Sequence, residues 1–265
     1  GNIVMKHRDQ ELFTSEMAYD FENRIASYVH EGLLVSDQAK LKSKRGYYHA
    51  ATGEAYFKDS VIVLLKDGMN LLSDTLRYLT RESKVEFVAP TLIEQDTLQI
   101  YTDQGYYQVD RQLSYFGNHP RYKRGGQIAE ARDIYHDAKL NLITLVHEAL
   151  IKDDKQEAKA DSIVFNENSG DVFLFKKAFY KEGIRELAGD TIWYNRKNHS
   201  LDVKGKTEVL EEGRLISAEK LKYSGQSLEG LALGNVIVSD TIAGYRIYCD
   251  TFLYNKKDKK FKAFG

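Results

Sequence analysis

Apolar and polar side chains alternate along most of the chain, in short runs bounded by turn residues. In residues 215–240, LISAEKLKYSGQSLEGLALGNVIVSD, one run contains Ile216 and Leu221, a polar SGQS turn follows, and a second run contains Leu231 and Val236. Neither run has the spacing of an amphipathic helix, and both are typical of β-strands. Because two strands cannot bury an apolar face alone, we expect further copies of this pair.

The copies are recognised by an acidic residue that precedes an aromatic ring by four positions, as Asp74 precedes Tyr78 and Glu219 precedes Tyr223. Successive rings lie 28 to 31 residues apart. This period predicts about nine two-strand units of about 29 residues each. We call the acidic position the anchor; its clear examples are Asp74, Asp103, Asp161, Asp190, Glu219 and Asp250.

The spacing around each anchor predicts a bend in the strand. Apolar or small residues occupy positions three and one before the anchor and two and four after it, as in Leu187, Gly189, Ile192 and Tyr194 around Asp190. A regular strand turns every second side chain to the same face, so the step of three across the anchor indicates a bulge. A carboxylate there can accept backbone N–H groups that the bend leaves unpaired, which makes the anchors structural residues.

The continuous repeat predicts one elongated domain over residues 1–265, with an irregular break near 117–127. The segment that begins at Gly1 matches the half-unit that begins at Gly234, and the chain ends at the corresponding phase with Gly265. We therefore expect the chain to be a segment of a longer protein, or its ends to pair with another strand.

Composition and motifs argue against several classes of function. With a net charge of −1, the chain has no global field that would attract nucleic acid. Seven histidines and one cysteine show no metal-ligand spacing, and neither a nucleophile elbow nor a dinucleotide fingerprint is present. We expect no metal, no cofactor, no catalytic residue and no enzymatic activity. Neither a signal peptide nor a long apolar membrane-spanning run is present in this chain.

The unit resembles the repeat of the OstA/LptA family of periplasmic lipopolysaccharide-transport proteins. The clearest matches are residues 71–78, 187–194, 216–238 and 247–265. The resemblance implies an all-β, folded-over β-jellyroll, or β-taco, with two facing sheets and an apolar groove between them. It also implies a periplasmic location and a groove that holds the acyl chains of lipopolysaccharide or lipid A during export to the outer membrane. End-to-end self-association or docking to other transport components would use open edge strands.

On this interpretation, the groove is lined by apolar residues three before and two after the anchors, and we expect these to include Leu71, Leu76, Ile100, Ile163, Leu187, Ile192, Ile216 and Leu221. A purely structural β-solenoid, such as a surface or adhesin stalk, would give the same pattern with a closed interior and no lipid cargo. A gap between the sheets would favour transport, and full interdigitation would favour the stalk.

Overall fold

The computed structural model describes residues 3–7, 10–66 and 68–265, and those residues form strands and turns without a helix. The prediction of an all-β protein is therefore confirmed. The chain divides into two compact units: unit 1 contains residues 1–125 and 133–139, and unit 2 contains residues 126–132 and 140–265. The single repeat domain with a break near 117–127, and the count of nine units, stay predictions. Gly1 lies outside the described residues.

Unit 1 is built mostly from short strands. Its strands are β1 (Ile3–His7), β2 (Gln10–Thr14), β3 (Ala18–Asp20), β4 (Ile25–Tyr28), β5 (Gly32–Val35), β6 (Ala39–Ser43), β7 (Arg45–His49), β8 (Glu54–Leu65), β9 (Asn70–Leu79), β10 (Lys84–Phe87), β11 (Thr91–Gln95), β12 (Leu98–Thr102), β13 (Gln104–Gln108), β14 (Leu113–Gly117), β15 (Arg121–Arg124) and β17 (Asp133–Asp137).

The long strands β8 and β9 connect two layers within unit 1. The second half of β8 pairs with β6, and its first half pairs with β7. Likewise, the first half of β9 pairs with β11 and its second half with β10. The first layer therefore runs β1–β2–β5–β6–β8–β9–β11–β12–β15, and the second runs β3–β4–β7–β8–β9–β10–β13–β14–β17.

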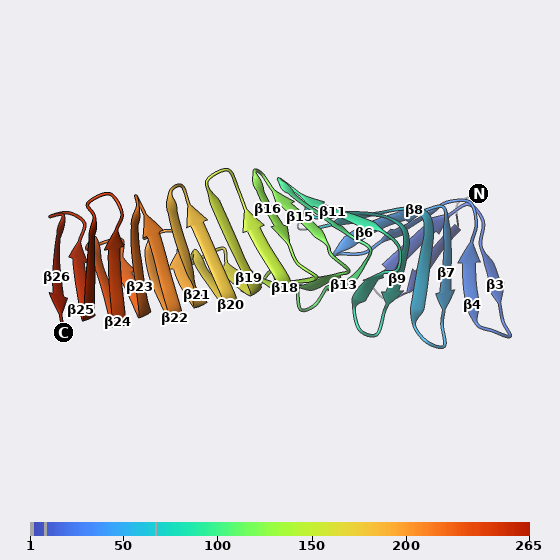
Figure 1. The fold of residues 1–265 in the computed structure, drawn as a ribbon. Helices are drawn as coiled ribbons and strands as arrows, with labels where there is room; N and C mark the ends of the chain where they lie inside the picture. The colour runs from blue at the N-terminus through green and yellow to red at the C-terminus, as the bar shows by residue number, and fades with distance from the viewer. Residues whose placement is uncertain (1–2, 8–9, 67) are drawn as a thin grey trace. The chain divides into compact units, whose positions relative to one another are not determined.

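Unit 2 also has two layers, and it consists mainly of long strands that each belong to both. We call the layer that contains Leu187 and Val209 its first layer and the layer that contains Ile192 and Val203 its second layer. Figure 1 shows β18 to β26 lying side by side, coloured from green through yellow to red. The strands of the unit are β16 (Gln127–Glu130), β18 (Leu142–Lys152), β19 (Gln156–Asn166), β20 (Asp171–Glu182), β21 (Arg185–Asn195), β22 (Ser200–Glu211), β23 (Arg214–Ser224), β24 (Glu229–Asp240), β25 (Tyr245–Asn255) and β26 (Lys260–Phe264). From β18 onward, each pairs antiparallel with the next in sequence.

A bulge divides each long strand pair where the sequence predicts a bend. Lys58 of β8 pairs with Thr75, and Val61 pairs with Ser73. Asp59 and Ser60 therefore both lie opposite Asp74. In unit 2, two residues likewise lie opposite one anchor: 147–148 opposite Asp161, 176–177 opposite Asp190, 205–206 opposite Glu219 and 234–235 opposite Asp250. Every residue of these five pairs has a left-handed backbone. The extra residue bends the strand, which lets its two halves join different layers.

Asparagine and aspartate begin many of the turns between strands. The Asn166 side-chain oxygen accepts the N–H groups of Asn168 and Ser169, at 3.0 and 2.8 Å. Asp240 does the same for Ile242 and Ala243. These short side chains satisfy turn N–H groups that the strands leave unpaired, so the turn sequence itself ends each strand.

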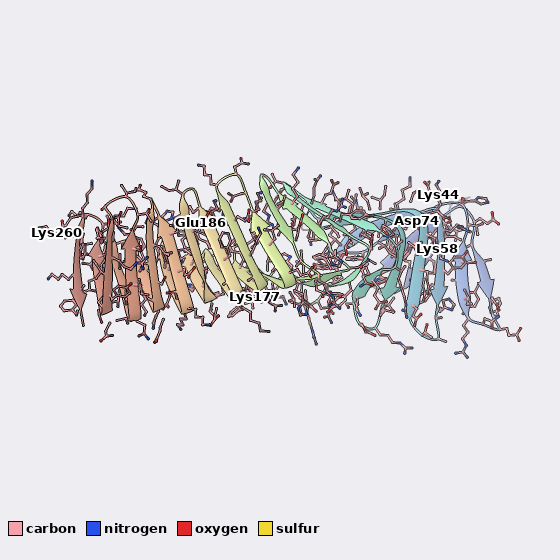
Figure 2. All side chains as sticks on the ribbon, viewed as in Figure 1. Lys44, Lys58, Asp74, Lys177, Glu186 and Lys260 are labelled. Carbon is pink, nitrogen blue, oxygen red and sulfur yellow. The ribbon has the colours of Figure 1, made fainter. Side chains whose placement is uncertain are left out.

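The core of each unit lies between its two layers, where rows of apolar side chains cross the strands. In the second layer of unit 2, one row is fully or nearly fully buried over eight strands: Leu145, Ile163, Leu174, Ile192, Val203, Leu221, Ala232 and Phe252. Charged side chains such as Lys58, Lys177 and Glu186, labelled in Figure 2, lie on outward-facing positions of the strands. This alternation of buried and outward residues is the pattern that the sequence shows.

Candidate functional site

The predicted groove residues lie in the inward rows of their units. In unit 1, Leu71 and Ile100 both pair with Ile93 in the first layer, while Leu76 lies in the second layer between Phe57 and Phe87. In unit 2, Ile163, Ile192 and Leu221 lie in the second layer, and Leu187 and Ile216 both pair with Val209 in the first. All are buried except Ile216, which is half-buried.

The anchor carboxylates lie outside these rows, at the bends. Glu219 accepts a hydrogen bond of 2.7 Å from the Asn235 side chain, and Asp161 lies 3.6 Å from His147 Nδ1. Asp103 lies between β12 and β13, and its carboxylate accepts a hydrogen bond of 3.4 Å from the Asn118 side-chain nitrogen. Asp74, Asp190 and Asp250 are exposed. For Glu219, Asp161 and Asp103, the described contacts join the carboxylate to side chains of adjacent segments, which fits a structural role.

A gap lies between the two layers of unit 1. Its cavity volume is about 60 Å³, and it opens to solvent. The first layer contributes Leu12 and Leu34 to its wall, and the second layer contributes Ala26, Ala55 and Phe57. Further lining residues are Met5, Gln10, Met17, Ser27, Tyr28, Gly46, Tyr47, Tyr48, Tyr78 and Thr80. Ala26 and Ala55 are small, and they leave space between the two layers here.

Tyr28 forms one end of the gap and depends on two glycines. Its ring occupies the positions that Cβ atoms at Gly32 and Gly46 would need. Its hydroxyl lies 2.6 Å from Ser43 Oγ, and burial raises the pKa of Tyr28 despite that hydrogen bond. The tyrosine therefore stays neutral and fixed, and any side chain larger than hydrogen at either glycine would displace it.

In unit 2 the two layers meet along the strand ends opposite the bulges, and we call this line the mouth. Arg196, in the turn after β21, lies 3.9 Å from Asp153, in the turn after β18. Lys256 lies 3.5 Å from Glu211 at the end of β22, and Glu211 also accepts a 2.8 Å hydrogen bond from Arg185. These pairs connect the first layer to the second, so polar contacts close the mouth over the apolar rows.

A small chamber lies just inside this mouth. Its cavity volume is about 20 Å³, and its apolar floor is made by Ile151, Ala158, Phe165 and Val172. Its polar rim is made by Gln127, Asp153, Gln156, Tyr180, Tyr194 and Arg196. The rings of Tyr180 and Tyr194, from opposite layers, have centroids 4.7 Å apart. The sequence pattern did not predict this chamber. One signal was present: Tyr180 is aromatic, whereas its neighbours in the same row, Ala158 and Leu187, are small or aliphatic.

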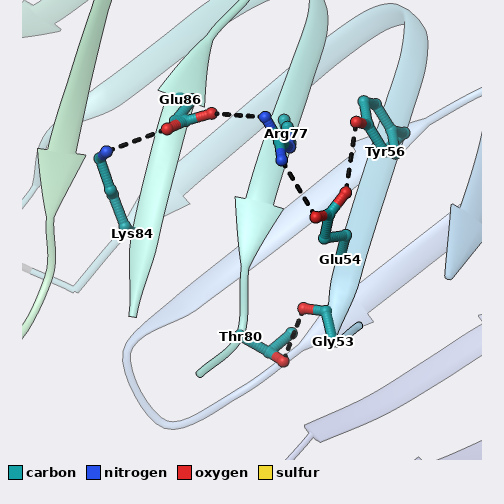
Figure 3. Close-up of polar contacts among 7 residues, drawn as sticks. All are labelled: Gly53, Glu54, Tyr56, Arg77, Thr80, Lys84 and Glu86. Atoms are coloured by element: carbon teal, nitrogen blue, oxygen red, sulfur yellow. Dashed lines mark hydrogen bonds and ion pairs between the residues drawn. The ribbon is translucent and has the colours of Figure 1, made fainter. Parts of the chain in front are cut away.

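The outer face of the second layer in unit 1 carries a network of charges. Arg77 lies 3.1 Å from Glu54 and 3.2 Å from Glu86, and Lys84 lies 2.9 Å from the other oxygen of Glu86 (Figure 3). The hydrogen bond to Glu54 is the main cause that raises the pKa of Arg77. Because each acid already has a basic partner, this surface provides cross-strand stabilisation rather than catalytic groups.

The described residues contain no cluster of three or more histidine, cysteine, aspartate or glutamate side chains that could hold a metal ion. Over the same part of the chain, no helix has the length and apolar character needed to cross a membrane.

Together, the bent antiparallel strands and the apolar interior define an all-β repeat protein with two facing layers. Residues 1–74 match the family model of OstA-like proteins, so the resemblance to the OstA/LptA family is confirmed over that segment. No curated protein matches the chain. Among solved structures, the chain is similar to LptH of Pseudomonas aeruginosa, described as the LptA-homologous periplasmic component of the lipopolysaccharide transport device. That match has 10% identity and a TM-score of 0.40, over 43% of this chain and 94% of LptH.

Proposed function

We propose that this chain is a non-enzymatic protein of lipopolysaccharide transport that shields acyl chains within its apolar interior. The observation that carries the proposal is the gap in unit 1, whose walls are mostly apolar and belong to both layers. Most of the residues around this gap fall within the segment that matches OstA-like proteins. The gap is smaller than an acyl chain, so it marks the place where we expect the two layers to separate.

The mechanism is passive and needs no covalent step. Each methylene group moved from water to the apolar interior gains about 0.8 kcal/mol. The two layers of unit 1 part along the gap to admit the chain. Within each unit the inward rows provide further apolar wall once the layers have parted, and the residues expected to line it are Leu71, Leu76, Ile100, Ile163, Leu187, Ile192, Ile216 and Leu221. The lipid stays bound until a partner with a comparable apolar surface accepts it.

The proposal includes the periplasm as the location and lipopolysaccharide or lipid A as the cargo, by analogy with the OstA/LptA family. It also includes end-to-end self-association, or docking to other transport components, through strand edges. β26 pairs with β25 through residues 251–255, and the described structure gives no partner to the opposite edge of β26. Such an edge can pair with a strand of another chain.

The test uses neighbouring leucines on opposite faces of β5. Leu34 lines the gap, whereas Leu33 faces outward and is 39% exposed. We expect Leu34→Glu to lower the affinity for a fluorescent lipid A analogue at least tenfold, because a carboxylate in the gap must be desolvated. Leu33→Glu is the matched control and should leave affinity unchanged. Circular dichroism would verify that both variants keep the β-structure; equal binding by the two variants would contradict the proposal.

One observation favours the structural β-solenoid as a second candidate. In part of unit 2 the inward rows are tightly packed, and Leu174, Ile192 and Val203 have no exposed surface. A stalk requires only such packing. Native mass spectrometry of protein purified from a Gram-negative host separates the two functions, because a lipid carrier retains copurified lipid and a stalk does not.

A further inference from the structure

The chamber inside the mouth of unit 2 contains a buried hydroxyl that no well-formed hydrogen bond satisfies. Tyr180 is 3% exposed, and among the described residues its hydroxyl meets only that of Tyr194, in a contact outside ordinary hydrogen-bond geometry. The adjacent Tyr194 hydroxyl is engaged with His199 Nδ1 at 3.0 Å. Leaving a buried hydroxyl unpaired is unfavourable, so an oxygen acceptor supplied by a ligand would complete the site.

The rim also contains a cation, the Arg196 guanidinium, whose hydrogen-bonding capacity is only partly used. The contacts described for the Arg196 guanidinium are the 3.9 Å approach to Asp153 and its position 5.4 Å from the centre of the Phe165 ring. A guanidinium has five N–H donors, and an ion pair of that length uses few of them. Asp153 already has other hydrogen-bond partners, because its Oδ1 accepts hydrogen bonds from the backbone N–H groups of Lys155 and Gln156, both at 2.9 Å.

The floor beneath these two groups is apolar. Ile151 and Ala158 come from the first layer, and Phe165 and Val172 come from the second. The chamber thus places an apolar surface, one neutral donor and one cation in sequence from the interior to the mouth. An anionic fatty-acyl lipid presents its groups in the matching order: an acyl chain for the apolar surface, a carbonyl oxygen for the donor and an anionic group for the cation.

We propose that this chamber binds the junction between the chain and the polar part of an anionic fatty-acyl lipid. The Tyr180 hydroxyl donates to the ester or amide carbonyl, the chain lies over Phe165 and Val172, and Arg196 pairs with a phosphate. Binding displaces Asp153 from Arg196 and separates the layers at this point of the mouth. This inference extends the proposed function, because it assigns a recognition site for the polar junction of the lipid.

The test compares three soluble amphiphiles by isothermal titration calorimetry with the whole chain. Lauroyl lysophosphatidic acid has both carbonyl and phosphate, lauryl phosphate lacks the carbonyl, and glyceryl monolaurate lacks the phosphate. We expect Tyr180→Phe to weaken binding of the two carbonyl probes about tenfold and to leave lauryl phosphate unchanged. Arg196→Gln should weaken only the two phosphate probes. Tyr248→Phe, at an outward residue that is 67% exposed, is the matched control.

We expect Asp153→Asn to change the binding of the phosphate probes in the opposite direction. Asparagine keeps the Oδ1 acceptor of the turn but removes the charge that competes for Arg196, so the phosphate probes should bind a few-fold more tightly. If Tyr180→Phe weakens all three probes equally, or none, the assignment of the carbonyl is wrong. If the chain binds these probes and Leu34→Glu reduces that binding while the Tyr180 and Arg196 variants do not, the chamber is excluded and the proposed function stands. Absence of binding by the wild-type chain would overturn both.

Discussion

At the residue scale, the side chains that distinguish this interior from an ordinary core are polar ones. The apolar residues of the inward rows could be predicted from their spacing, as Ile163 and Ile192 illustrate. Tyr180 could not, because its neighbours in the row, Ala158 and Leu187, supply the regular pattern and tyrosine is common throughout the chain. Its unpaired hydroxyl depends on where the opposite layer places Tyr194, which no local pattern encodes.

Removal of the Tyr180 hydroxyl should stabilise the lipid-free protein. The phenylalanine ring of Tyr180→Phe fills the same space without an unsatisfied buried group, and the gain should be about 1 kcal/mol. Urea denaturation of lipid-free protein, followed by circular dichroism, measures the change in the free energy of unfolding. A loss of stability would show that the hydroxyl already has a partner.

Asp171 should make a tryptophan signal depend on pH. Hydrogen bonds from Ser169, Asn195 and Trp193 lower the pKa of Asp171 below 3.8, against the opposing effect of burial. The ionised carboxylate therefore stabilises the folded state above pH 3.8, and this contribution is lost as the pH falls through the lower folded-state pKa.

Trp193 is the single tryptophan of the chain, and its Nε1 donates to Asp171 at 2.9 Å. Its fluorescence should change as acid protonates Asp171, in a step centred below pH 3.8. Asp171→Asn keeps an acceptor oxygen for Trp193 but has no charge to titrate, so the step should disappear. A step that persists in this variant would assign the transition to another group.

At the element scale, the bulge was predictable and its backbone conformation was not. The step of three residues across Asp190 locates the bend, and the structure places two residues opposite that anchor. Those two residues are Lys176 and Lys177, both with left-handed backbones. Lysine gives no sequence signal for that conformation, whereas Gly205 at the next bulge does. Tertiary pairing of the strand halves imposes the conformation where glycine is absent.

Gly205 tests how the bulge supports the anchor. Its φ is +72°, and a Cβ atom there would overlap the Asp190 carboxylate. We expect Gly205→Ala to destabilise the protein by about 1–3 kcal/mol, as measured by urea denaturation. Asp190→Ala should recover part of this loss in the double variant, because it removes the overlapping atoms.

Gly230→Ala is the matched control for Gly205→Ala. It lies in β24, another long strand of unit 2, lacks the left-handed backbone, and its Cβ would have no neighbour closer than 3.8 Å. Its substitution should have little effect. Equal destabilisation at both glycines would show that the carboxylate does not constrain the bulge.

At the scale of the whole molecule, the repeat predicts two-layered strands but not where the interior remains unfilled. In the second layer, Ala26 and Ala55 both lie beside Tyr48 and line the gap in unit 1, as does Gly46, two residues before Tyr48. Each residue alone is a conservative small side chain within a strand. Only the pairing of β4, β7 and β8 brings them together.

Filling the gap should separate stability from lipid binding. Ala55 is buried, and Ala55→Leu adds apolar volume to the gap. We expect lower affinity for the lipid A analogue, with unchanged or higher thermal stability, because the new side chain occupies existing space. Ala188→Leu, on the outward row of unit 2, serves as the control. Full binding by Ala55→Leu would place the acyl chain elsewhere.

The strand order of unit 2 makes its length adjustable. From β18 to β26, each strand is bonded to those next to it in sequence, and every bend falls at the same register. Excising one hairpin, for example residues 196–224, would bring β21 against β24 with inward side chains still inward. Evolution can thus vary the length of unit 2 in steps of two strands, about 10 Å each, without redesigning either layer.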